Sequence, residues 1–201
     1  MNFDPKNVSR ETFSKLESYK SLLLKWQKAI NLVSRETILD LETRHFQDSL
    51  QLISYIPDDV HSHIDLGSGA GFPGLVLAIA CSNLNSTLVE SDLRKCEFLK
   101  NVSRETFLSV TILNQRIESI SQDQKYDLIT ARALADLNQL LIYAKPLSHE
   151  ESLFLFLKGR EAQKEIEDAQ KNWEFDLEIS PSLTHSEGQI LVIRNLVSKG
   201  N

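Results

Sequence analysis

The segment His63–Gly74 reads HIDLGSGAGFPG, in which an apolar run leads into a glycine-rich loop. Glycines in such a loop let the backbone turn tightly and approach a ligand, and the N-terminus of a following helix offers unpaired N–H groups. The spacing can be counted in two ways: from Gly67 it is G-x-G-x-G, and from Gly69 it is G-x-G-x-x-G. The two counts predict different ligands, so the surrounding sequence must decide between them.

The first count is typical of loops that bind S-adenosylmethionine, whereas the second resembles the dinucleotide fingerprint. Asp65 precedes the first glycine, and a carboxylate there would repel a pyrophosphate and suit an ammonium or sulfonium group. Glu90 ends the next predicted strand and could accept both ribose hydroxyls, which serves NAD and S-adenosylmethionine alike. The rest of the chain has room for one sheet and no separate catalytic domain. We therefore predict S-adenosylmethionine as the cofactor.

Short apolar runs alternate with segments of helical spacing along the middle of the chain, which predicts a parallel sheet covered on both faces. The predicted strands are 63–67, 86–91, 109–114, 126–131 and 152–159, and the predicted helices between them are 74–81, 92–107 and 136–147. Runs 175–180 and 189–196 follow one another with only a loop between them, which predicts a hairpin at the sheet edge. The predicted fold class is α/β, a doubly wound, mostly parallel sheet of the S-adenosylmethionine-dependent methyltransferase type with a C-terminal antiparallel hairpin.

The N-terminal part of the chain has a different pattern from the rest. Apolar residues recur at steps of three or four over 9–31 and again over 35–55, which predicts two helices. We therefore expect an N-terminal helical extension, 1–58, joined to a methyltransferase domain, 59–201.

Composition limits the class of protein. The chain has 201 residues, of which 41% are hydrophobic and 25% charged, and its net charge of −6 argues against indiscriminate binding to nucleic acid. No apolar run approaches the length of about 20 residues that a membrane span needs, and the N-terminus lacks the pattern of a secretion signal. The two cysteines, Cys81 and Cys96, do not make a disulfide framework, and their spacing is not that of zinc ligands. We expect a cytoplasmic monomer that does not bind a membrane.

Seven motifs occur in order along the chain: WQKAINLVS (26–34), RHFQDSL (44–50), DLGSGAGFPGLVLAIA (65–80), LVESDLRKCEFL (88–99), NQRIE (114–118), YDLITARAL (126–134) and LFLKG (155–159). Together they resemble one family, the ribosomal RNA small subunit methyltransferase G family, also called glucose-inhibited division protein B. The resemblance extends from about Tyr19 to Lys158.

The resemblance implies S-adenosylmethionine-dependent methylation of N7 of a specific guanosine in bacterial 16S ribosomal RNA. The partner would be that RNA, within the small ribosomal subunit or an assembly intermediate. Guanine N7 carries a lone pair and no proton, so in-line methyl transfer needs no obligatory general base. The rate enhancement would then come from holding N7, the methyl carbon and the sulfur in line.

Cofactor contacts are predicted at the glycine loop and at the ends of the following strands. Gly67 and Gly69 would allow close backbone approach, and Phe72 would line the pocket. Glu90 would hold the ribose. The resemblance implies that Ile117 and Glu118 contact the adenine and that Arg132 lies beside cofactor and substrate. The predicted cofactor-binding residues are thus Gly67, Gly69, Phe72, Glu90, Ile117, Glu118 and Arg132.

Substrate-positioning residues are predicted on the helical extension and at the strand ends. His45 and Asp48 lie three positions apart on one helical face, so they could pair with each other. A structural role, as an ion pair or a buried hydrogen bond, remains an alternative for several of these side chains. The set comprises Arg132, His45, Asp48, Arg116, Asn31 and Lys158.

Two other classes of function remain open: a nicotinamide-dependent oxidoreductase and a non-catalytic protein that binds RNA or ribosomes. His61 and His63 have no further ligands near them in the sequence, so we expect them at the surface and predict no metal site.

Overall fold

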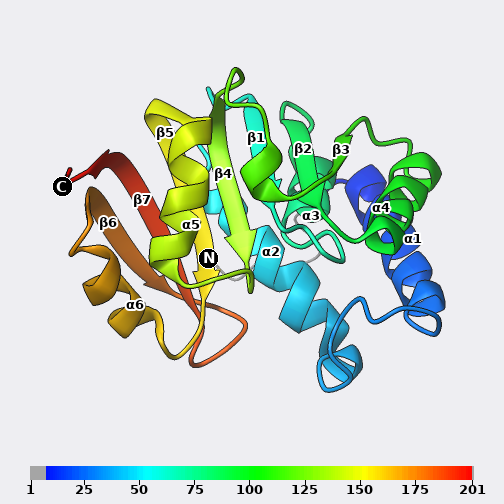
Figure 1. Cartoon of the computed structure of the whole chain (residues 1–201). Helices are drawn as coiled ribbons and strands as arrows, with labels where there is room; N and C mark the ends of the chain where they lie inside the picture. The colour runs from blue at the N-terminus through cyan, green and yellow to red at the C-terminus, as the bar shows by residue number, and fades with distance from the viewer. Residues whose placement is uncertain (1–7, 201) are drawn as a thin grey trace.

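Seven strands form one sheet in the order β3-β2-β1-β4-β5-β7-β6 in the computed structural model, which describes residues 8–200 (Figure 1). Their bounds are β1 Ser62–Leu66, β2 Asn85–Glu90, β3 Thr111–Asn114, β4 Tyr126–Arg132, β5 Ser148–Lys158, β6 Trp173–Pro181 and β7 Gln189–Ser198. Strands β1 to β5 are parallel, whereas β7 pairs antiparallel with β5 and β6 antiparallel with β7. The predicted doubly wound sheet and its C-terminal hairpin are confirmed.

The strand order reverses beside β1, which pairs with β2 on one side and with β4 on the other. In open α/β sheets the carboxyl ends of the strands on either side of such a reversal leave a crevice where ligands bind. The glycine loop begins at the carboxyl end of β1, so the topology places it in that crevice.

Helices cover both faces of the sheet. Helices α5 (Leu137–Ala144) and α6 (Ala162–Ala169) pack with Ile64 and Ile129 on one face, which is the front in Figure 1. Helices α1 (Arg10–Trp26), α3 (Gly74–Ala80) and α4 (Leu93–Glu105) share a core with Leu88 on the other face. Neighbouring residues of a strand point to opposite faces, so the apolar strand runs supply both cores.

The N-terminal helix α1 is anchored on the glycine loop. Its Tyr19 and Leu23 are fully buried, and the Tyr19 hydroxyl donates a hydrogen bond to the carbonyl of Ala70. The Tyr19 ring stacks on Phe72 with 5.3 Å between the ring centroids. Ser9 begins the helix, since its side chain accepts the N–H of Thr12. The helical extension is therefore part of the wall that holds the loop.

The second predicted helix, over 35–55, is wrong as a continuous α-helix. The segment is a series of short turns of different width, namely η2 (Ile38–Asp40), the π-helical η3 (Glu42–Gln47), α2 (Asp48–Leu50) and η4 (Gln51–Tyr55). The spacing of apolar residues predicts that a segment is helical. It does not distinguish 3₁₀, α and π helices, whose backbone hydrogen bonds span three, four and five residues.

Two further expectations are corrected. Helix α6 has no predicted counterpart, because it buries only Ala162, Ile166 and Ala169 within a mostly charged segment. His63, which was expected at the surface, is fully buried, and its ring bonds to Ser86 Oγ and Thr130 Oγ1, each at 2.9 Å. Burial lowers the pKa of His63 to about 3, so the ring is neutral.

Within residues 8–200, no helix is long and apolar enough to cross a membrane. The same part of the chain contains no group of three or more histidine, cysteine, aspartate or glutamate side chains that could hold a metal ion.

Candidate functional site

A cavity of about 1030 Å³ opens at the carboxyl ends of the parallel strands, where the glycine loop meets the helical extension. It is lined by all the predicted site residues except one. Those that line it are His45, Asp48, Gly67, Gly69, Phe72, Glu90, Arg116, Ile117, Glu118, Arg132 and Lys158. Asn31 is exposed and does not line the cavity, although Leu32 and Val33 beside it do, so the structure shows no contact that supports a site role for Asn31.

The glycine loop has a backbone shape that side chains would disturb at two positions. Gly67 has φ +66°, and a Cβ there would lie 2.7 Å from Leu134 Cδ1. Gly71 has φ +96°, and a Cβ there would lie 2.6 Å from both the Tyr19 hydroxyl and Leu75 Cδ1. Left-handed backbone and close neighbours together require glycine.

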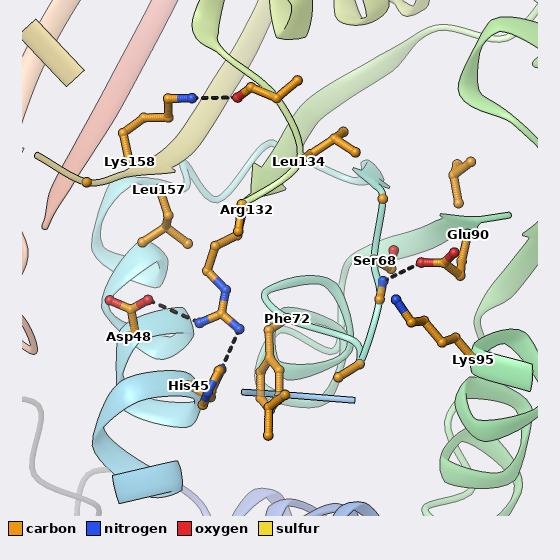
Figure 2. A pocket seen from close by; sticks show the side chains of 18 of the residues that line it. His45, Asp48, Ser68, Phe72, Glu90, Lys95, Arg132, Leu134, Leu157 and Lys158 are labelled. Atoms are coloured by element: carbon orange, nitrogen blue, oxygen red, sulfur yellow. Dashed lines mark hydrogen bonds and ion pairs between the residues drawn. The ribbon is translucent and has the colours of Figure 1, made fainter. Parts of the chain in front are cut away.

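Glu90 joins the glycine loop to the turn after β2. Its Oε2 accepts the N–H of Gly69 at 2.9 Å (Figure 2). Its Oε1 accepts the N–H of Asp92 at 2.7 Å. An ionised carboxylate has about four acceptor sites, so each oxygen keeps one for a further donor. Glu90 is 8% exposed and lines the cavity. These features fit a ribose with two adjacent hydroxyls.

Ile117 and Glu118, the predicted adenine contacts, line the cavity beside α5. The hydroxyl of Tyr143, on α5, donates to Glu118 Oε1 at 2.9 Å. Hydrogen bonds from the backbone N–H of Glu118 and from Tyr143 lower the pKa of Glu118, so its carboxylate is charged at neutral pH. Lys95, in the first turn of α4, also lines the cavity and points toward Glu90 (Figure 2).

Tyr143 and Lys95 were not among the predicted site residues. Each lies on a helix, where the spacing of apolar residues indicates only which side chains pack in the core and which face solvent. Position could have marked Lys95, which follows Glu90 closely at the start of the next helix, whereas Tyr143 lies at the far end of α5 and carries no such signal.

Arg132 binds the helical extension from the carboxyl end of β4. Its Nη1 donates to Asp48 Oδ2 at 3.2 Å and to the carbonyl of Arg44 at 3.1 Å, and its Nη2 donates to His45 Nδ1 at 2.7 Å. The guanidinium carbon lies 4.9 Å from the centroid of the Phe72 ring. The Arg44 carbonyl belongs to the π-helical turn, in which the N–H of Asp48 bonds to the carbonyls of His45 and Thr43 rather than to that of Arg44. These contacts hold the guanidinium in one orientation.

His45 is a neutral acceptor in this network. Burial and the neighbouring Arg132 lower the pKa of His45 to about 3. Because Arg132 donates to Nδ1, we assign the proton to Nε2, which lies 2.9 Å from Thr37 Oγ1. His45 and Asp48 do not pair with each other, contrary to one sequence-based expectation; both bind Arg132 instead.

Lys158 is held away from solvent by partners from two other segments. Its Nζ lies 2.5 Å from Glu165 Oε2 and donates to the carbonyl of Ala135 at 2.7 Å. Glu165 Oε2 also accepts the N–H of Leu137, at the start of α5, at 2.8 Å. These bonds fix the loop after β4, whose Leu134 closes over Gly67. The lysine therefore shapes the cavity wall.

Asp65 does not face the cavity, so the electrostatic argument that assigned it to the ligand is wrong in its geometry. The side chain is fully buried beneath the loop, where Oδ1 accepts the hydroxyl of Thr130 at 2.7 Å and Oδ2 has no hydrogen-bond partner. Burial raises the pKa of Asp65 to about 6, against the opposing effect of the Thr130 hydrogen bond.

This buried carboxyl predicts a pH-dependent stability. The pKa of Asp65 in the folded chain, about 6, lies above its ordinary value of 3.8, so the folded state holds the proton more tightly. The resulting stability is complete below about pH 4 and is lost as the pH rises through about 6, a change of about 3 kcal/mol. The variant Asp65→Asn cannot ionise. Its unfolding free energy relative to the native chain should therefore rise by that amount between about pH 4 and 7.

Urea unfolding of both chains followed by circular dichroism measures this difference. Asp58→Asn, at an exposed turn, is the matched control, because it removes the same charge without burial. A difference between the native chain and Asp65→Asn that stays constant with pH would contradict the prediction.

Known proteins that are similar to this chain in sequence have the same description as the family model that matches it. The family model described as rRNA small subunit methyltransferase G matches residues 12–197. A protein of Parvibaculum lavamentivorans named ribosomal RNA small subunit methyltransferase G is 47% identical, over 94% of this chain and 86% of its own. A Gluconobacter oxydans protein of the same name is 48% identical, over 92% of this chain and 95% of its own.

Solved structures share the fold at low sequence identity. The ribosomal protein L11 methylase of Lactobacillus delbrueckii subsp. bulgaricus has a TM-score of 0.61 at 16% identity, covering 76% of this chain and 78% of that one. A mutant of MtNAS in complex with S-adenosylmethionine has a TM-score of 0.59 at 13% identity, covering 90% of this chain and 71% of that one. The sheet and its flanking helices are therefore of a type that these proteins share.

Proposed function

Since the chain belongs to the rRNA small subunit methyltransferase G family, we propose that it methylates N7 of a specific guanosine in 16S ribosomal RNA with S-adenosylmethionine. The observation that carries this function is a single cavity with two unlike ends. One end presents the glycine loop and the acceptor sites of Glu90, and the other presents the guanidinium of Arg132. The cavity volume of about 1030 Å³ is at the upper limit for a single small ligand, which leaves room for a base beside the cofactor.

The cofactor end is formed by the predicted residues. Gly67 and Gly69 let the backbone approach the cofactor, Glu90 accepts the ribose hydroxyls, and Ile117 and Glu118 contact the adenine. S-adenosylmethionine, when bound, supplies a methyl group on a positively charged sulfur.

The substrate end positions a base without taking a proton from it. Guanine N7 has a free lone pair, so the reaction needs no general base. This agrees with the state of His45, which is neutral and has both ring nitrogens in contact with Arg132 or Thr37. Arg132 is oriented to donate a hydrogen bond to a base at its free edge. The role of Arg132 is to position the base. The rate enhancement comes from holding N7 in line with the methyl group.

Further residues around the cavity have roles in the same proposed reaction. Arg116, exposed at the rim, binds RNA phosphate, and Lys158 and Asp48 act by shaping the cavity and holding Arg132. A regular RNA helix hides N7 in a narrow major groove, so the target guanosine lies in an accessible loop of the RNA. The protein works in the cytoplasm as a monomer, on the small subunit or an assembly intermediate. The proposed division is a helical extension, 1–58, and a methyltransferase domain, 59–201, of which residues 1–7 and 201 lie outside the part of the chain that the structure describes.

Methyl-labelled S-adenosylmethionine, incubated with the chain and small ribosomal subunits from cells that lack the gene, tests the function. We expect label in 7-methylguanosine at one position of 16S RNA after nucleoside digestion. Label in another nucleoside contradicts the regiochemistry. Binding of NAD(H) without S-adenosylmethionine would indicate an oxidoreductase, and binding of subunits without methyl transfer would indicate a non-catalytic RNA-binding protein.

A further inference from the structure

The loop between β6 and β7 contacts the helical extension through side chains that no motif marks. Thr184 Oγ1 donates to Asp48 Oδ1 at 2.7 Å, and Ser182 Oγ donates to the same oxygen at 3.2 Å. Gln51 Nε2 donates to it at 2.8 Å. More than 130 positions separate Asp48 from Thr184 in the chain, so tertiary structure alone brings this cluster together.

The two oxygens of Asp48 have different partners. Oδ1 accepts from Thr184, Ser182 and Gln51, whereas Oδ2 accepts from Arg132. The partners of Oδ1 fix the rotation of the carboxylate, and that rotation sets where Oδ2 can receive the guanidinium. The side chains of Asp48 and Arg132 are only 14% and 16% exposed, so water cannot readily replace a lost donor.

The hydroxyl of Thr184 is not required to hold the loop in place. The loop backbone has its own bond to the extension, since the N–H of Leu183 donates to Gln51 Oε1 at 2.9 Å. The turn is also closed by the N–H of Ser182, which donates to the carbonyl of Gly188 at 2.8 Å. The shortest bond in the cluster is thus directed at Asp48 and leads through it to Arg132.

We propose that Thr184 is a positioning residue for methyl transfer: through Asp48 it sets the orientation of Arg132 toward the target base. Thr184 does not line the cavity, so it acts without touching the substrate, whereas its neighbours Ser182 and His185 form part of the wall. The β6–β7 loop thereby couples the sheet edge to the reacting centre. This inference rests on the proposed function of Arg132.

Thr184→Val tests the proposal, because valine keeps the shape and removes the hydroxyl. We expect kcat/KM for small ribosomal subunits to fall about tenfold, the effect of losing a hydrogen bond to a charged group. Affinity for S-adenosylmethionine should stay within about twofold, since the cofactor end is formed by other residues. Thr184→Ser, which restores the donor, should recover most of the loss.

A second readout does not depend on catalysis. The Nε–Hε group of Arg132 should give a rigid NMR signal in the native chain and in Thr184→Ser, and a more mobile one in Thr184→Val. Thr106→Val is the matched control: this buried threonine donates to the carbonyl of Val102 at 2.7 Å and does not line the cavity. It should alter stability without altering the Arg132 signal.

The outcomes separate the two claims. Native activity and a rigid Arg132 in Thr184→Val overturn the positioning role, as does a loss of activity that Thr184→Ser fails to restore. If the native chain methylates no RNA, the proposed function fails, while the NMR comparison still decides whether Thr184 orders Arg132.

Discussion

Replacing Arg132 by methionine should lower methyl transfer to small ribosomal subunits at least about 100-fold, the usual effect of removing one preorganised donor from an active site. Methionine fills a similar volume and keeps contact with Phe72, but it cannot donate to the base. Affinity for S-adenosylmethionine should change much less, because Glu90, the proposed ribose contact, is held by the N–H groups of Gly69 and Asp92 and not by Arg132. Single-turnover transfer and calorimetry with the cofactor measure the two effects separately.

The variant will also lose stability, and the assay must allow for this. Removing Arg132 leaves Asp48 without its cationic partner at a site that is only 14% exposed. The cost should be about 2 kcal/mol, below the range for fully buried pairs because some water reaches the site. Arg104→Met, an exposed arginine on α4 outside the cavity, is the control. Transfer within about tenfold of the native rate in folded Arg132→Met would exclude Arg132 from the positioning role.

Replacing Tyr19 by alanine should lower the free energy of unfolding by about 3–5 kcal/mol, the range for an aromatic side chain removed from a core. The Tyr19 ring is fully buried and contacts Phe46 and Phe72, with centroids 5.0 and 5.3 Å away. Its hydroxyl also holds the carbonyl of Ala70 in the glycine loop. We therefore expect weaker binding of S-adenosylmethionine as well as lower stability, measured by urea unfolding and calorimetry.

Tyr19→Phe separates packing from the hydrogen bond. It keeps the ring and leaves one buried carbonyl without its donor, so it should cost about 1–3 kcal/mol. Phe13→Ala, on the same helix but 47% exposed, should cost much less. If Tyr19→Ala impaired RNA methylation and left cofactor affinity and stability unchanged, α1 would serve the RNA alone and would not support the loop.

Several features of this protein follow from local sequence. Alternation of apolar runs with helical spacing predicted the five parallel strands, β1 to β5, because burial of a strand on both faces demands a continuous apolar stretch. The two closely spaced final runs predicted the hairpin of β6 and β7. The glycine spacing, with Glu90 at the next strand end, predicted a loop that binds a nucleotide-like ligand, but it suited NAD and S-adenosylmethionine alike. Parallel strands bring their carboxyl ends to one edge, which explains why residues from separate motifs line a single cavity.

Tertiary structure decided what those residues contact. Sequence placed Asp65 at a strand end but could not show that it lies beneath the loop, since one position along a strand reverses the direction of a side chain. It marked His45, Asp48 and Arg132, yet their joint network and the role of Thr184 depend on segments far apart in the chain. The pattern of apolar and polar residues along a segment indicates which of its residues are buried and which are exposed. Hydrogen-bond partners depend on which segments the folded core brings into contact, and no local pattern contains that information.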